Sequence, residues 1–246
     1  MSASSFQIAV FETVFLSALL LLGAALLRGR VRWVWLLPIP AIAFIAKLLM
    51  FEAGAGTFGD WIPGRYNWEG KVAALVCWVG VIAVFFRNNL ATVGLTLRQN
   101  GPFRTIALGV AALTAIATAL WSVFYFPGVK SEPLPDILYQ ATMPTIEEEL
   151  WFRGVLLAML TLGFTSRNAQ QPSIAGVVLA AVIVSLQFWG VHSIGTDGDW
   201  GFVFHAWFNP VAGIYGLLWV IVRLGTGSLV LPMLLHTWAN TAGYIL

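Results

Sequence analysis

Three consecutive acidic residues, Glu147, Glu148 and Glu149, precede Arg153 in a mainly apolar stretch that runs on to Phe164. A charged side chain at the centre of a membrane-spanning helix costs about 2.5–3.5 kcal/mol on insertion scales, so such residues usually mark a functional site. On a helix, Glu149 and Arg153 share a face and can pair, which would fix that face. Glu148 points about 100° away and stays available for chemistry.

The same acidic segment also fits a helix start. Thr145 and Glu148 have the spacing of a capping box, Pro144 precedes them, and acidic residues in a first turn interact favourably with the helix dipole. In that interpretation the acids are caps near the membrane surface. Residues 136–146 are largely apolar, however, which favours a longer helix that carries the acids into the membrane.

Two histidines lie in apolar segments farther along the chain. His192 follows Phe188 and Trp189, and His236 lies four residues before Asn240, on the same face of a helix. Each motif alone is explained by a hydrogen bond to a neighbouring helix or at the membrane interface. In combination with the acids they suggest a shared site, and we expect Phe188 and Trp189 to contact its substrate.

Two polar features have no assigned role. Glu147 is an additional acid beside the pair Glu148 and Glu149. His205 and Asn209 repeat the His-x-x-x-Asn spacing, but they follow an acidic, glycine-rich loop. We therefore interpret His205 and Asn209 as a contact at the membrane interface rather than as part of a site.

These residue types can catalyse a hydrolysis. Glu148 can act as a general base on a water molecule that His192 holds. His236 and Asn240 can donate hydrogen bonds to the oxyanion that forms when a carbonyl is attacked. Alternatively, His192, His236 and Glu148 could bind a divalent metal such as zinc, which activates water directly. The residues alone leave both mechanisms open.

Membrane-spanning helices must position these side chains. Hydrophobic residues make up 59% of the 246 residues and charged residues only 10%, whereas soluble domains contain about 25% charged residues. We predict an all-α, polytopic transmembrane helix bundle with about eight spans, because each apolar segment approaches the ~20 residues needed to cross a bilayer. The expected spans cover residues 7–27, 33–51, 72–86, 105–126, 136–163, 173–192, 207–222 and 227–246.

The charged residues between the spans predict an orientation. Arginines gather in alternate connections, whereas the opposite connections contain acids such as Glu52 and Glu69 together with Lys71. Basic connections lie on the cytoplasmic side, so both termini are expected outside. This topology places Glu148, His192 and His236 in the outer half of the bilayer, where they can meet in one cavity.

The composition also bounds the partners and the domain organisation. The chain has no basic patch with interleaved aromatic residues, so we expect the lipid bilayer and no nucleic acid as partner. We expect a multi-pass protein of the cell membrane. Residues 1–90 are predicted to be N-terminal transmembrane helices, and residues 91–246 a catalytic transmembrane domain, within one integral unit.

Three short motifs, each on its own expected span, occur in a fixed order: Glu148-Glu149-x-x-x-Arg153, Phe188-x-x-x-His192 and His236-x-x-x-Asn240. This order resembles the CAAX-protease and bacteriocin-processing (Abi) family of intramembrane proteases, which includes type II CAAX prenyl endopeptidases. The resemblance covers residues 90–246. It implies that Glu148 and His192 activate water and that His236 and Asn240 stabilise the oxyanion. The family is often described as metalloproteases.

We therefore expect an intramembrane endopeptidase. Its substrate would be a peptide or protein with a membrane-associated segment or a C-terminal tail, and a lipid-modified protein is one option. Two other classes of function remain open on the sequence. Intramembrane Glu and His residues also relay protons in membrane transporters, and a non-catalytic scaffold or immunity protein would use them only for packing.

Overall fold

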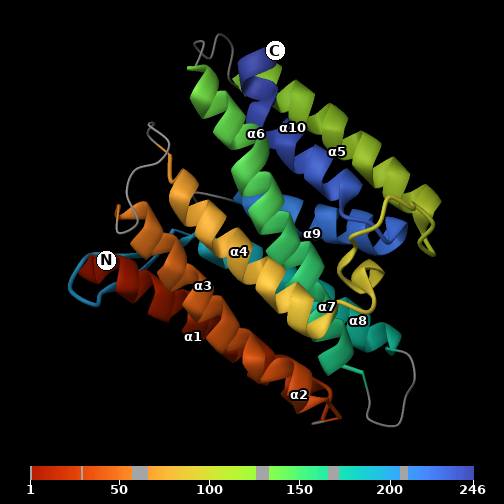
Figure 1. Ribbon diagram of the computed structural model, residues 1–246. Helices are drawn as coiled ribbons and strands as arrows, with labels where there is room; N and C mark the ends of the chain where they lie inside the picture. The colour runs from red at the N-terminus through yellow and green to blue at the C-terminus, as the bar shows by residue number, and fades with distance from the viewer. Residues whose placement is uncertain (1, 29, 57–65, 126–132, 166–171, 206–209) are drawn as a thin grey trace.

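The computed structural model describes residues 2–28, 30–56, 66–125, 133–165, 172–205 and 210–246 (Figure 1). In these residues, each of the eight segments expected to span the membrane is helical. Residues 126 and 207–209 of the expected spans lie outside the described ranges. The helices are α1 (Ala3–Leu26), α2 (Trp33–Leu36), α3 (Pro38–Gly54), α4 (Trp68–Phe85), α5 (Arg104–Tyr125), α6 (Leu134–Glu149), α7 (Leu157–Gly163), α8 (Ile174–Val191), α9 (Pro210–Thr226) and α10 (Val230–Ile245).

Three shorter features connect these helices. A 3₁₀ turn, η1 (Leu90–Val93), follows α4, and a π-helical segment, η2 (Leu150–Leu156), joins α6 to α7. Two strands, β1 (Ile194–Thr196) and β2 (Phe202–Phe204), form an antiparallel hairpin in which Ile194 lies opposite Phe204. The sequence did not predict this hairpin, because its strands are only three residues long.

Length and apolar composition explain most of the helices. Among the described residues, five helices are long and apolar enough to cross a membrane, and α9 is a shorter apolar helix. Polar caps define where several of them begin. The side chains of Ser2, Asn67 and Ser173 accept hydrogen bonds from backbone N–H groups at the starts of α1, α4 and α8, which satisfies donors that a helix start leaves unpaired. The predicted all-α membrane bundle is confirmed.

The long helices form a closed ring in which each one packs against the next. The order around the ring is α1, α3, α4, α6, α10, α5, α9 and α8, and α8 packs back against α1. Figure 1 shows α1, α3, α4 and α6 side by side, with α10 and α5 beyond them. The N-terminal helices therefore complete the wall between α6 and α8, the two elements that carry Glu148 and precede His192.

The π-helical segment η2 lies inside this ring. All seven of its residues are buried, and it contacts α4, α8 and α9. The acidic residues lie immediately before it, at the end of α6, which begins at Leu134 and continues through Pro144. The alternative that a helix starts at Thr145 and that the acids cap it is therefore wrong. π-Helical turns are rare and often occur at functional sites.

Hydrogen bonds and ring packing bind the β1–β2 hairpin to α1. Gln7 of α1 donates a hydrogen bond from Nε2 to the carbonyl oxygen of Gly198 and accepts one at Oε1 from Thr196. Phe11 packs edge-on against Phe202, with ring centroids 5.3 Å apart. Because β1 begins two residues after His192, these contacts hold the end of α8 against α1.

Because α4 packs closely against α3, alanine substitutions at two glycines of α4 should differ in their effect on stability. A Cβ atom at Gly70 would clash with the backbone oxygen of Met50 and with the Asn67 side chain, whereas a Cβ atom at Gly80 would meet no atom within 4 Å. We expect Gly70→Ala to destabilise the protein by about 1–3 kcal/mol, as overpacking does. Gly80→Ala is the matched control and should unfold like the wild type. Thermal unfolding in detergent micelles measures both, and equal midpoints would contradict the packing described for α3 and α4.

Candidate active site

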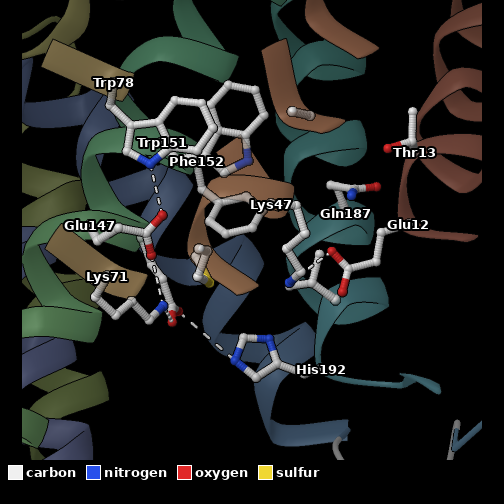
Figure 2. A pocket seen from close by; sticks show the side chains of 14 residues that line it. Glu12, Thr13, Lys47, Lys71, Trp78, Glu147, Trp151, Phe152, Gln187 and His192 are labelled. Carbon is white, nitrogen blue, oxygen red and sulfur yellow. Dashed lines mark hydrogen bonds and ion pairs between the residues drawn. The ribbon is translucent and has the colours of Figure 1, made fainter. Parts of the chain in front are cut away.

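A cavity of about 130 Å³ opens between the N-terminal helices and the elements that carry the acidic segment (Figure 2). Its walls come from α1, α3, α4, α6, η2 and α8. The polar residues that line it are Glu12, Thr13, Lys47, Lys71, Glu147, Glu148, Gln187 and His192. An apolar helix bundle with so many polar groups around one cavity has the chemistry of a site rather than of a packing defect.

The Glu148 carboxylate is held at one oxygen and faces two imidazoles with the other. Its Oε1 accepts a hydrogen bond from Lys71 Nζ at 2.7 Å. Its Oε2 lies 3.9 Å from Nε2 of His192 and 3.9 Å from Nε2 of His236. Those separations are too long for direct hydrogen bonds and suit one bridging water molecule. The structure thus brings together three residues that the sequence predicted to converge.

Hydrogen bonds fix the orientation of both imidazole rings. Nδ1 of His192 donates to the carbonyl oxygen of Phe188 at 2.7 Å, because a carbonyl can only accept. Nδ1 of His236 lies 2.9 Å from Oε1 of Glu149. In the neutral rings the proton is therefore on Nδ1, and each Nε2 presents a lone pair towards Glu148.

The predicted pair of Glu149 and Arg153 is confirmed. The two side chains are fully buried, and Arg153 Nη1 donates to Glu149 Oε1 at 2.9 Å. The guanidinium carbon also lies 4.1 Å from the ring centroid of Phe188 and 5.1 Å from that of Trp219, an arrangement that favours a cation. The same oxygen, Oε1 of Glu149, thus accepts from Arg153 and orients the ring of His236.

Glu147 takes part in a second set of contacts. Its Oε2 accepts from Lys71 Nζ at 2.7 Å, and its Oε1 accepts from Trp78 Nε1 at 2.7 Å. The Trp78 ring stacks on Trp151 with centroids 4.2 Å apart and planes 14° apart. The same ammonium therefore joins Glu147 and Glu148, as Figure 2 shows for Lys71, Glu147 and Trp78.

A further ion pair lies on the other side of the cavity. Lys47 Nζ is 2.9 Å from Glu12 Oε2, which joins α3 to α1. Gln187 of α8 is also part of this wall and is almost fully buried. Figure 2 shows Lys47, Glu12 and Gln187 apart from the group around Glu147 and Lys71.

Four other predicted residues lie away from the cavity wall. Phe188 is buried and packs edge-on against Phe152, with centroids 5.0 Å apart. Trp189 lines a separate apolar groove of about 680 Å³ between α8 and α9. Asn240 donates from Nδ2 to the carbonyl oxygen of Gln140 at 3.3 Å. His205 is exposed just after β2, and its expected partner Asn209 lies outside the described residues.

The side chains proposed as metal ligands do not form a preformed metal site. The described ranges contain no group of three His, Cys, Asp or Glu side chains placed to hold a metal ion. The Glu148 carboxylate is already paired with the Lys71 ammonium at 2.7 Å. A second cation at this carboxylate would be repelled by the first. His192, His236 and Glu148 therefore do not fit zinc as they stand.

Sequence reasoning missed the N-terminal contributions to the site. Lys71 was expected in an outer connection, but it lies near the start of α4 and reaches α6. Glu12 and Lys47 did carry a signal, since each is a lone charge inside an expected span. Trp78 carried none, because a tryptophan in an apolar segment is most often simply part of the packing.

Comparison with known proteins gives one match. Residues 130–242 match the family model described as type II CAAX prenyl endopeptidase Rce1-like. The matched region contains Glu148, His192 and His236, whereas Lys71 lies outside it. No curated protein and no solved structure matches the chain.

The buried pair predicts a large loss of stability when only one partner is removed. Arg153→Met leaves the fully buried Glu149 carboxylate without its cation, and breaking such a pair costs about 3–5 kcal/mol. The double variant Arg153→Met/Glu149→Met removes both charges and should recover part of that loss. Chemical unfolding in micelles measures both variants. An Arg153→Met protein as stable as the wild type would show that the pair does not support the fold.

Proposed function

We propose that this protein is an intramembrane endopeptidase that acts near the C-terminus of a membrane-associated substrate, because residues 130–242 match the family model described as type II CAAX prenyl endopeptidase Rce1-like. The observation that carries the proposal is the position of Glu148. One of its oxygens faces two oriented imidazoles at 3.9 Å, on the wall of a cavity within the helix bundle.

Glu148 is the general base of the proposed reaction. Its Oε2 removes a proton from a water molecule while the water oxygen attacks the carbonyl carbon of the scissile peptide bond. The tetrahedral intermediate then collapses and the carbon–nitrogen bond breaks. Glu148 returns the proton to the leaving amine, so the carboxylate is regenerated and one water is consumed for each bond cleaved.

The two histidines hold the attacking water. A water between Glu148 and His192 donates one hydrogen to Oε2 and the other to the Nε2 lone pair, which leaves an oxygen lone pair directed at the substrate. His236 lies at the same 3.9 Å from Oε2 and is kept in place by Glu149. Its position favours contact with this water over the expected role as oxyanion donor. The amide of Asn240 has two N–H donors, of which one goes to the Gln140 carbonyl, so the second can serve the oxyanion role expected from the sequence.

The two remaining predicted substrate contacts receive different roles. Phe188 supports the site by packing beneath Arg153 and beside His192, with ring centroids of Phe188 and His192 4.6 Å apart. Trp189 lies beside the apolar groove between α8 and α9. We assign this groove to the apolar part of a lipid-modified substrate, because its lining is almost entirely hydrocarbon.

The proposed activity places the protein as a multi-pass component of the cell membrane. We assign catalysis to residues 91–246, and helices of residues 1–90 line the cavity beside them. Apolar helices that could cross a bilayer support this placement.

Replacement of the general base tests the proposal. We expect Glu148→Gln to lower kcat at least about 10²-fold, the smaller end of what a general base contributes. The probe is a quenched-fluorescent peptide ending in a prenylated CAAX sequence, in phosphatidylcholine vesicles, with products identified by mass spectrometry. His192→Gln should also impair cleavage, whereas His205→Gln, at an exposed histidine, is the matched control.

The outcomes of that experiment distinguish a protease from a transporter and from a scaffold. A Glu148→Gln protein that folds and still cleaves the peptide would sink the assignment of Glu148. A transporter would show no specific cleavage in any variant and would instead lose proton-coupled transport. A scaffold would lose neither activity.

Removal of metals tests the choice of mechanism. A glutamate-activated water needs no metal, so purified, active protein should keep its rate after exhaustive treatment with EDTA and 1,10-phenanthroline. Elemental analysis of the same sample should find less than one transition metal per protein. Loss of activity on chelation, with recovery on adding Zn²⁺, would replace Glu148 as the activator of water by a metal.

A further inference from the structure

We propose that Lys71 is a positioning residue for Glu148, and that Glu147 and Trp78 hold Lys71 for this task. The inference rests on the proposed function, since it concerns the orientation of the general base. It assigns to the N-terminal helices a part in the reaction, because Lys71 and Trp78 come from α4, outside the region that matches the protease family.

The two oxygens of the Glu148 carboxylate have different surroundings. Lys71 Nζ binds Oε1 at 2.7 Å, while Oε2 faces the two imidazoles. A carboxylate without such a partner rotates readily about its last torsion, whose preference is broad and two-fold. The ammonium removes that freedom and leaves one defined oxygen for the water. Lys71 thereby decides which oxygen of Glu148 acts as the base.

Lys71 is itself held in place. Its ammonium bridges Glu148 and Glu147 at 2.7 Å each. Glu147 has its other oxygen on the indole N–H of Trp78, which stacks on Trp151 of η2. A lysine has a flexible four-carbon stem, and two charged contacts restrict it far more than one does. Glu147, which had no role in the sequence motifs, acts on Glu148 through Lys71.

The Lys71 ammonium also balances the charges of its two acidic neighbours. Glu147 and Glu148 are consecutive acids in a buried setting, and like charges so close disfavour each other's ionised form. A single ammonium between them balances that repulsion. Lys47 provides a comparison within the same cavity, since its ammonium pairs with Glu12. Of these two lysines, only Lys71 contacts Glu148 in the part of the chain that the structure describes.

Kinetics of matched lysine variants test the inference. Lys71→Met keeps the length of the side chain and removes its charge. We expect kcat on the prenylated CAAX peptide to fall about 10²-fold, the cost of misplacing a catalytic group by about 1 Å, with KM within about threefold of the wild type. Arg98→Met, which removes an exposed cation between η1 and α5, is the control and should keep kcat within about threefold. Lys71→Arg should restore part of the rate, because a guanidinium can also bridge two carboxylates.

A double-mutant cycle tests whether Glu147 acts through Lys71. Glu147→Gln alone should lower kcat about 3–10-fold by loosening the ammonium. In the Lys71→Met background the same change should cause no further loss, because the side chain through which it acts is gone. Multiplicative losses in the double variant would show that Glu147 acts on Glu148 by another route.

Infrared spectroscopy gives a readout that does not need catalysis. The carboxylate band of Glu148, isolated by subtracting the Glu148→Gln spectrum, should shift in Lys71→Met and stay unchanged in Arg98→Met. If Glu148→Gln is inactive but Lys71→Met keeps both its kcat and this band, the positioning role is wrong and the proposed function stands. If Glu148→Gln remains active, the assignment of Glu148 as general base fails, and the infrared shift alone then decides whether Lys71 orients this carboxylate.

Discussion

A charge placed among apolar helices is stable only where an opposite charge or a directed hydrogen bond meets it. This constraint connects the elements of the bundle. The α1–α3 contact contains the ion pair of Glu12 and Lys47, and the α4–α6 contact contains the ammonium of Lys71 between two carboxylates. At the end of α6, Glu149 joins a buried guanidinium to an imidazole of α10. Each of these charges alone would oppose insertion into the membrane. As pairs, they connect particular helices of the bundle.

The ring of helices encloses these ion pairs around one cavity. The wall between α6 and α8 is closed by α1, α3 and α4, so the cavity at Glu148 is bounded by helices from both halves of the chain. The buried π-helical segment next to the acids fixes the face of α6 through stacked aromatic rings. A carboxylate in such surroundings is held by packing and by hydrogen bonds to its neighbours, which is what the role proposed for Glu148 requires.

Much of the fold was accessible from the sequence, because hydropathy is a local property. All eight expected segments are helical where the structure describes them. The convergence of Glu148, His192 and His236 also followed, since the topology put them in one half of the bilayer. The sequence did not predict which side chains pair with the acidic residues. The position of Lys71 at the edge of an apolar segment suggested a loop, and neighbour relations such as α4 beside α6 are set by packing between distant segments.

The pairing of charges also bears on how the chain is assembled during synthesis. Glu12 of α1 and Lys47 of α3 are both translated early, so their ion pair can join these two helices before later segments are made. The two carboxylates that the structure describes against the Lys71 ammonium, Glu147 and Glu148, are translated more than seventy residues later. These two contacts can therefore form only once α6 has followed α4, and the same step brings α6 into the wall of the cavity.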